Sequence, residues 1–530
     1  MTERRLLPFA TVILQLVLLA PNLIWPYFED TGSFAATAQW NGRGLALYRD
    51  LLDQKPPAFF LEERLRLALF GMTPLAARAF ELALLVIGGW MLGVAGAAGH
   101  EKDSARARAF VAVAFAALSS SALWFLPERG QVEFHQAAFV CIALGATALA
   151  LRESGNVRRA LGLAFVAGAA SAWSCWLKPQ SAAMALAIVA ALAVRRGPRS
   201  LRAKLVAAHV GAVVALSLAM VVWMAARGQL RAFADVMFRL NPAYTRLPQF
   251  SLRHVLPALY NIYSGPRALV VFALGLSGVV SYVRATRAKA LSLAEGMLVV
   301  APLPWAIAQF ASGGYLFRYH SIVAVVPFAL LAGVGGAFVF ERLRTIRPPA
   351  RAALAIGTAL VVTANQSWRD CAGDLVFWAS GVKPTAALYD RYGEEGHYFR
   401  YAAQVEAARI VRERVPPGQP FYVFGRAGVT YLYADRPPLN RVLATTLAYM
   451  RVPGAAELRK EIVDAIVTRP PKILLVRGDD AMPWFGVPVP SNVLLARDPV
   501  LGRFVSQNYR RIGRIGVSFL VFERCDGQPC

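Results

Sequence analysis

The chain has 530 residues, of which 57% are hydrophobic and 17% charged, and this composition excludes an ordinary soluble enzyme of that size. The apolar residues gather in runs of roughly 20 residues, the length that crosses a bilayer. The formal net charge of +25 lies mostly in short loops between these runs, which is typical of cytoplasmic loops rather than of nucleic-acid binding. We therefore predict a multi-pass membrane protein that attracts anionic membrane lipids and lipid-linked phosphates.

The apolar runs predict about eleven transmembrane helices with the N-terminus in the cytoplasm. This topology places about twenty basic residues on the cytoplasmic side and about three in the short outer loops. We expect an uncleaved first helix and outer loops at 29–73, 127–133 and 227–265. The expected segments are residues 7–28, 74–98, 109–126, 134–151, 160–177, 181–194, 205–225, 267–283, 295–311, 316–340 and 352–368.

The first outer loop, 29–73, combines acidic and basic groups that a bilayer span does not tolerate. It opens with Glu29–Asp30 and closes on Lys55 before Pro56–Pro57. The prolines hold the residue before them in an extended conformation, which gives the lysine a defined direction. We expect short interfacial helices at 31–41 and 58–70, the second with its charged residues toward water. The plain alternative is that these charged groups merely end helices.

Other outer loops add charged groups at the same face. Glu128 and Glu133 lie in or beside the second outer loop, and Lys178 precedes a proline. Arg318 begins an otherwise apolar segment, where an arginine costs free energy unless it is paired, touches an anion or snorkels to water. Acids and cations around one cavity suit transfer from an anionic lipid-phosphate donor, with a carboxylate as base and cations on the leaving phosphate.

The chain after residue 368 has a different pattern. Residues 398–414 show helical periodicity, 420–425 and 472–476 read as short buried strands, and 512–523 reads as a final strand pair. The fold class is therefore an all-α polytopic membrane protein with a C-terminal α/β extracytoplasmic domain. We place a transmembrane domain at 1–368 and a periplasmic domain at 369–530. A bridge between Cys525 and Cys530 is compatible with that oxidising side.

A family resemblance rests on these short motifs. The pattern Glu29–Asp30, Tyr48 and Gln54–Pro57 resembles the first outer loop of the glycosyltransferase C superfamily, in the branch of protein O-mannosyltransferases and the lipid A aminoarabinose transferase. Phe317–Tyr319 is similar to a late-helix motif of these families, and the stretch 421–441 resembles the tail of bacterial members. The resemblance implies a polyprenyl-phosphate-linked sugar donor, a lipid, glycan or protein acceptor, and a location in the bacterial inner membrane.

The resemblance also implies roles for individual residues. Asp30, with Glu29 beside it, becomes the candidate base or acceptor-positioning acid, and Glu128 stands where some members carry a second acid. The candidate ligands of the lipid phosphate are Lys55, Arg318 and Tyr319.

We assign no cofactor and no metal ligand, and a divalent metal stays open but unsupported, because the chain departs from the family at one position. Ala58 and two phenylalanines follow the prolines where some relatives place a further acid. The histidines that could be considered as ligands, His135, His254 and His320, are isolated, and isolated histidines are more often hydrogen-bonded structural residues.

The favoured hypothesis is an inverting membrane glycosyltransferase with the long loop 227–265 as a lid. A transporter or flippase for lipid-linked sugars is a second hypothesis, although we find neither internal symmetry nor polar groups at midplane. A non-catalytic subunit of an envelope assembly is a third, and the sequence does not exclude it. The sequence names neither the sugar, the acceptor nor the carrier lipid.

Overall fold

The computed structural model describes residues 12–97 except 14 and 18, 109–110, 113, 130–245, 266–287, 292–311, 318–342, 347, 349–350, 353, 366–395 and 399–525. These residues divide into two compact units. The helical unit comprises what is described of residues 1–23, 78–221 and 250–376, and the sheet unit what is described of 24–77, 222–249 and 377–530. The predicted domain boundary at 368/369 stays a prediction.

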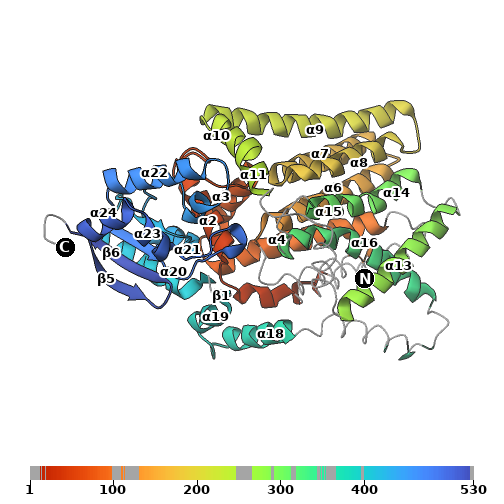
Figure 1. The fold of residues 1–530 in the computed structure, drawn as a ribbon. Helices are drawn as coiled ribbons and strands as arrows, with labels where there is room; N and C mark the ends of the chain where they lie inside the picture. The colour runs from red at the N-terminus through yellow and green to blue at the C-terminus, as the bar shows by residue number, and fades with distance from the viewer. Residues whose placement is uncertain are drawn as a thin grey trace. The chain divides into compact units, whose positions relative to one another are not determined.

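The helical unit contains long apolar helices joined by short turns (Figure 1). The elements that lie wholly or mostly in it are η1 (Ala20–Ile24), α4 (Pro74–Gly96), α6 (Val132–Arg152), α7 (Val157–Leu177), η3 (Pro179–Ser181), α8 (Ala182–Ala193), α9 (Arg199–Ala226), α13 (Pro266–Arg287), α14 (Leu293–Val300), α15 (Pro302–Ala311), η5 (Arg318–Ala324), α16 (Val325–Arg342) and α18 (Gln366–Ala379).

Five helical stretches in the described residues are long and apolar enough to cross a membrane: Pro74–Gly96, Val132–Arg152, Val157–Leu177, Arg199–Ala226 and Leu293–Phe310. Most of the predicted segments at 109–126 and 352–368 lies outside the described residues, as does part of 7–28. The prediction of a polytopic helical protein is thus supported, while the count of eleven crossings stays a prediction.

Small residues let the membrane helices approach closely. A methyl group added at Gly145 of α6 would lie 2.4 Å from the carbonyl oxygen of Met91 in α4. One added at Gly168 of α7 would lie 2.2 Å from the carbonyl oxygen of His209 in α9. Helices in a bilayer associate largely through such close packing. Lipid tails are as apolar as the side chains, so helix association gains little free energy from the hydrophobic effect.

The sheet unit is built around a four-stranded sheet with the strand order β3-β4-β6-β5. Strands β3 (Tyr422–Phe424) and β4 (Ile473–Arg477) are parallel, while β5 (Tyr509–Ile515) and β6 (Phe519–Arg524) join antiparallel. Every residue of β3 and β4 is buried, as expected for parallel strands covered on both faces. The predicted strands at 420–425, 472–476 and 512–523 are therefore confirmed.

Helices and short elements complete this unit (Figure 1). Those from the first loop and from the loop after α9 are α2 (Glu29–Gly42), α3 (Pro57–Phe70), α10 (Leu230–Asp235), the π-turn η4 (Val236–Leu240) and α11 (Asn241–Thr245). Those from the tail are α19 (Thr385–Tyr392), β1 (Glu394–Glu395), β2 (Phe399–Arg400), α20 (Tyr401–Arg414), α21 (Gly428–Ala434), η7 (Thr445–Tyr449), α22 (Ala455–Thr468), η8 (Pro483–Phe485), α23 (Ser491–Arg497) and α24 (Leu501–Asn508).

The two helices predicted in the first loop are confirmed as α2 and α3, and local sequence explains both. The hydroxyl of Thr31 accepts a 2.9 Å hydrogen bond from the N–H of Phe28, and two acids in the first turn favour the start of α2. Pro57 occupies the first turn of α3, where its missing N–H costs nothing. The orientation predicted for α3 is wrong, because Glu63 and Arg66 form a buried ion pair of 2.7 Å.

Candidate functional site

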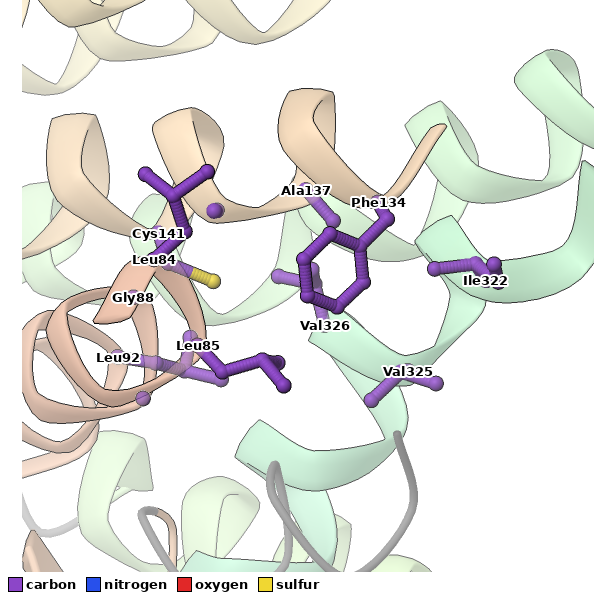
Figure 2. Close-up of a pocket in the computed structure, with 12 residues that line it drawn as sticks. Leu84, Leu85, Gly88, Leu92, Phe134, Ala137, Cys141, Ile322, Val325 and Val326 are labelled. Carbon is purple, nitrogen blue, oxygen red and sulfur yellow. The ribbon is translucent and has the colours of Figure 1, made fainter. Parts of the chain in front are cut away.

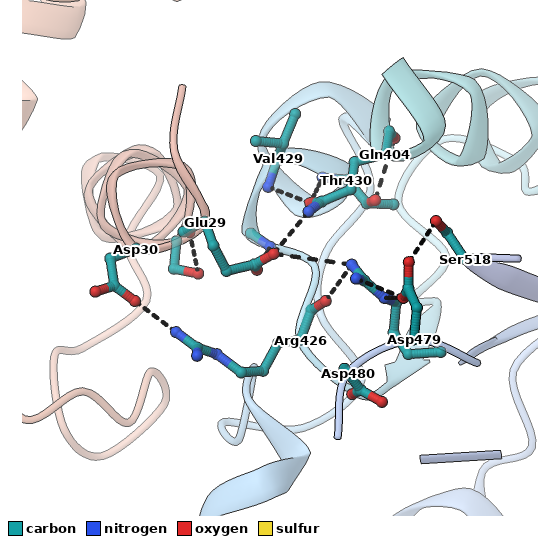
Figure 3. A network of polar contacts seen from close by, with 12 residues as sticks. Glu29, Asp30, Gln404, Arg426, Val429, Thr430, Asp479, Asp480 and Ser518 are labelled. Atoms are coloured by element: carbon teal, nitrogen blue, oxygen red, sulfur yellow. Dashed lines mark hydrogen bonds and ion pairs between the residues drawn. The ribbon is translucent and has the colours of Figure 1, made fainter. Parts of the chain in front are cut away.

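Asp30 lies in the first turn of α2 and faces the tail. Its Oδ1 accepts a 2.5 Å hydrogen bond from Nη2 of Arg426, which follows β3 (Figure 3). The side chains are 22% and 18% exposed, respectively, so the ion pair is shielded but open to solvent on one side. An ionised pair in this setting is stronger than one on an open surface.

Glu29, one residue earlier, is buried and belongs to a different set of contacts. Its Oε2 accepts a 2.8 Å hydrogen bond from Gln404, and its Oε1 accepts one of 3.3 Å from the backbone N–H of Gly428. Burial raises the pKa of Glu29, and the nearby charges of Arg477 and Arg426 act in the opposite direction. A carboxylate enclosed in this way suits holding the loop to the tail better than exchanging protons with a substrate.

Arg477, at the end of β4, is the buried cation behind Glu29. Its Nη1 lies 3.8 Å from Glu29 Oε2 and donates a 2.8 Å hydrogen bond to the backbone carbonyl of Arg426. Its Nε donates to Asp479, which also accepts from the hydroxyl of Ser518 at 2.6 Å (Figure 3). Removing such a charge from water is tolerated only when it is paired and hydrogen-bonded.

Gln404 of α20 links this network to α21. Its Oε1 accepts hydrogen bonds from the backbone N–H groups of Val429 and Thr430 at 3.0 and 3.4 Å, while its amide group donates to Glu29. The side chain thereby satisfies N–H groups at the start of a helix that otherwise lack partners. One glutamine therefore fixes α20, α21 and the first turn of α2 to each other.

The backbone of Lys55 is held by its neighbours. Its N–H donates to Asp53 Oδ1 at 2.9 Å, and its carbonyl accepts from the hydroxyl of Tyr48 at 2.8 Å. Tyr48 itself adopts the left-handed conformation with φ of 65°, which is uncommon for a non-glycine residue. The ammonium group lies 5.7 Å from the ring centre of Phe34. The defined direction predicted for Lys55 thus has a structural basis beyond the two prolines.

Asp53 was not singled out by the sequence reasoning. Burial raises its pKa to about 6, while the N–H and the charge of Lys55 lower it and the charge of Asp30 raises it. The two carboxyl groups and the lysine therefore lie within electrostatic reach of each other. The available signal was the position of an acid two residues before a proline-locked lysine, a spacing that lets a carboxylate accept from the backbone N–H.

The segment after α9 also contributes to this side of the sheet unit. Asn241 donates a 2.8 Å hydrogen bond to the carbonyl of Gln54, next to Lys55. Tyr244 acts electrostatically on Arg426, and its ring centre lies 5.7 Å from that of Phe485. The part of the predicted lid at 246–265 lies outside the described residues, so its closing motion stays a prediction.

The remaining predicted residues belong to the helical unit or are not described. Glu128 and His254 lie outside the described residues. The backbone of Arg318 starts η5, and Tyr319 next to it contacts the ring of His320 at 4.6 Å between ring centres. Among the residues that the structure describes, no group of three or more His, Cys, Asp or Glu side chains could hold a metal ion.

A polar cluster lies inside the helical unit. Lys178 Nζ lies 2.5 Å from Glu133 Oε1, and His320 Nε2 lies 3.6 Å from the same oxygen. Gln136 donates hydrogen bonds to Ser181 at 2.6 Å and to Gln309 at 3.2 Å. Lys178 sits in the break between α7 and α8, as polar groups at broken membrane helices commonly do.

The same unit contains an apolar cavity between α4, α6 and the η5–α16 segment (Figure 2). Its lining contains no charged residue: it is formed by Leu84, Leu85, Gly88, Gly89, Leu92, Phe134, Ala137, Ala138, Cys141, Ile322, Val325 and Val326. Such a lining accommodates hydrocarbon and offers nothing to a polar group.

The fold of the chain is similar to those of solved proteins, although its sequence is not close to any of them. No protein-family model and no curated sequence matches the chain. Among solved structures, ArnT from Cupriavidus metallidurans bound to undecaprenyl phosphate covers 98% of this chain and 98% of its own, with 16% identity and a TM-score of 0.61. The chain has the fold of ArnT. Apo ArnT gives a TM-score of 0.60 at 14% identity, with 97% of each chain covered.

A second solved protein is also similar to this chain. The archaeal oligosaccharyltransferase AglB from Archaeoglobus fulgidus, in complex with an inhibitory peptide and a dolichol-phosphate, gives a TM-score of 0.53 at 14% identity. The alignment covers 98% of this chain and 74% of AglB. ArnT and AglB are glycosyltransferase C superfamily members, so the resemblance read from the motifs is confirmed at the level of the fold.

Within this ArnT-like fold, the structure brings together part of the predicted site. Glu29, Asp30 and Lys55 share the sheet unit with Arg426 and Asp53, neither of which was predicted. Tyr319 and the backbone of Arg318 belong to the helical unit. The catalytic and phosphate-binding roles of all these residues stay predictions.

Proposed function

We propose that the protein is a membrane glycosyltransferase that moves a hexose or pentose from a polyprenyl-phosphate-linked donor to a lipid, glycan or protein acceptor. It would act on the outer face of the bacterial inner membrane. The observation that carries the proposal is the structure of the first loop, where Arg426 holds Asp30 and Asp53 holds the backbone of Lys55. The chain that carries this loop has the fold of ArnT, a protein solved with undecaprenyl phosphate.

The proposed reaction is a single inverting displacement. Asp30 takes the proton of the acceptor hydroxyl, and the acceptor oxygen attacks the anomeric carbon of the donor sugar. The bond between that carbon and the phosphate oxygen breaks, and the polyprenyl phosphate leaves with the electron pair. Lys55, with Arg318 and Tyr319 as further ligands, stabilises the charge on the leaving phosphate. Glu128 is retained as a second candidate acid.

We assign Glu29 a structural role within this proposal. Both of its side-chain oxygens already accept hydrogen bonds from the tail, and the residue is 1% exposed. A general base must reach the proton that it removes, which favours the more exposed Asp30. Lys55 remains the candidate phosphate ligand because its backbone is fixed while its ammonium group rests on an aromatic face that an anion can replace.

The test is a transfer assay with the purified protein in liposomes. A panel of radiolabelled polyprenyl-phosphate sugars is supplied with membrane extract as acceptor, and Asp30→Asn and Lys55→Ala are compared with wild type. Asp464→Asn and Lys460→Ala are the matched controls, since these residues form an exposed ion pair on α22. Transfer by wild type and both controls but by neither site variant supports the proposal. Movement of labelled lipid between leaflets without transfer contradicts it.

A further inference from the structure

Arg426 comes from the tail, yet its guanidinium meets the candidate base of the first loop. It pairs with Asp30, and within the described part of the chain its other side-chain hydrogen bond is a long one, at 3.5 Å to the sulfur of Met482. Burial disfavours its charge, but Asp30 first and then Glu29 more than compensate, so the pKa of Arg426 is raised. The tail thus places a permanent cation beside the acid of the proposed site.

The backbone before Arg426 is fixed by β3 and by Thr445. The N–H of Gly425 donates to Thr445 Oγ1 at 2.9 Å, and the carbonyl of Gly425 accepts from Thr445 N at 3.0 Å. Gly425 has a φ of +143°, and an added Cβ would lie 2.4 Å from Cγ of Arg477. Only glycine meets both conditions, so this turn cannot easily adopt another path.

The backbone at and after Arg426 is fixed by buried groups. Arg477 donates to its carbonyl at 2.8 Å, and two residues later the N–H of Gly428 donates to Glu29. A Cβ added at Gly428 would lie 2.1 Å from the backbone nitrogen of Ser33 in α2. The loop therefore cannot shift relative to α2 without breaking buried contacts.

This arrangement differs from a surface ion pair in the same unit. Arg409 contacts Glu406 and Glu413 on its own helix, where all three side chains are about half exposed. Arg426 instead projects from a turn held at both ends by buried hydrogen bonds. Holding a group by rigid surroundings is the structural requirement for a precisely oriented partner.

We infer that Arg426 is a positioning residue that fixes the orientation of the Asp30 carboxylate for proton transfer, so that the tail is an integral part of the catalytic centre. The inference rests on the proposed function, in which Asp30 is the base. A carboxylate misplaced by about 1 Å can lose on the order of a hundredfold in rate. Gln404 and Glu29 act one step further away, by holding the turn that carries Arg426.

The experiment compares steady-state transfer by wild type, Arg426→Gln and Arg426→Lys, with Arg409→Gln as the matched control. We expect Arg426→Gln to lower kcat by about tenfold to a hundredfold and to leave the donor KM within about twofold, because Arg426 acts through the base rather than on the donor. Arg426→Lys, which keeps the charge, should recover most of the loss. Arg409→Gln should match wild type.

A second measurement separates positioning from a merely structural role. Asp30→Glu keeps a carboxylate but displaces it, so adding Arg426→Gln should lower kcat further by less than about twofold. The inference is overturned if Arg426→Gln transfers within about twofold of wild type, or if the two losses multiply in the double variant. A folded Arg426→Lys that shows no recovery also overturns it. Inactive wild-type protein would instead reject the proposed function itself.

Discussion

Gln404 donates a 2.8 Å hydrogen bond to Glu29 across 375 residues of sequence, and both side chains are buried. The bond joins the first loop to the tail within one compact unit. The first loop and the tail also share one hydrophobic core, in which Ala35 and Trp40 of α2 cluster with Val423 and Phe519 of the sheet. The loop that carries the candidate acid is therefore folded onto the tail rather than being an independent segment.

Glu29→Ala should destabilise the protein by about 2–3 kcal/mol, because it leaves the Gln404 amide and the Gly428 N–H buried without their acceptor. Glu29→Gln keeps one acceptor and should cost about 1 kcal/mol. Thermal unfolding of the full chain in detergent measures both. Glu406→Ala, which removes an exposed ion pair of the same unit, should lie within about 0.5 kcal/mol of wild type. Equal destabilisation by all three variants would contradict the role of Glu29.

Gly428→Ala tests the close approach of α21 to α2. The new methyl group would overlap the Ser33 backbone, which cannot move aside as a flexible side chain could. We expect a loss of about 1–3 kcal/mol and reduced transfer, since Arg426 would move with the turn. Gly513→Ala is the control, because nothing lies within 4 Å of its added Cβ. A Gly428→Ala protein as stable and active as wild type would rule out this packing.

Asp53 should make the folded protein less stable as the pH rises. Its pKa is raised to about 6 in the folded protein from an ordinary value near 3.8, so the folded state binds the proton more tightly than the unfolded state. Asp53 therefore contributes stability at low pH that is lost as pH rises through about 6. Asp53→Asn stays neutral, so its melting temperature relative to wild type should be higher at about pH 8 than at about pH 5. No difference between these pH values would contradict the burial of Asp53.

Tyr48→Phe tests whether the fixed backbone at Lys55 matters. The variant removes the hydroxyl that donates to the Lys55 carbonyl and should cost about 1 kcal/mol of stability while lowering transfer several-fold. Initial transfer rates and melting temperatures are measured together. Tyr449→Phe is the control, because the buried Tyr449 hydroxyl has no hydrogen-bond partner within the described part of the chain. Unchanged transfer by Tyr48→Phe would show that the orientation of Lys55 is not set here.

The ion pair of Glu133 and Lys178 inside the helical unit predicts that the stability losses of mutations at these two residues do not add. Glu133→Ala or Lys178→Met alone leaves a buried charge with a lost partner and should destabilise by about 3 kcal/mol. The double variant removes both charges and should be closer to wild type than either single variant. Melting temperatures in detergent decide the matter. Losses that add in the double variant would show that the two groups do not act as a pair.

The local elements could be predicted because their signals are local. Alternating and continuous apolar patterns defined β3, β4 and the final strand pair, and the proline pair defined the start of α3. The burial of Arg66 could not be predicted from its helix, because a charged residue on an amphipathic segment normally faces water and only tertiary contacts, including Glu63, reverse this.

The candidate site could be predicted only in part for the same reason. Asp30 and Lys55 belong to one short loop with a recognisable motif. Arg426 is 396 residues away from Asp30 in sequence, and no local pattern indicates that β3 ends beside α2. The role of Glu29 likewise depends on Gln404, an unremarkable residue in an amphipathic helix.

We propose that Asp30 takes part in the chemical step and does not only hold the fold or bind the donor. The most direct measurement follows donor binding and sugar transfer in one sample, using wild type and Asp30→Asn in liposomes with a labelled polyprenyl-phosphate sugar. We predict that Asp30→Asn binds the donor with an affinity within about threefold of wild type and transfers at least about a thousandfold more slowly. An Asp30→Asn protein that is folded, binds donor and transfers at the wild-type rate would contradict the account.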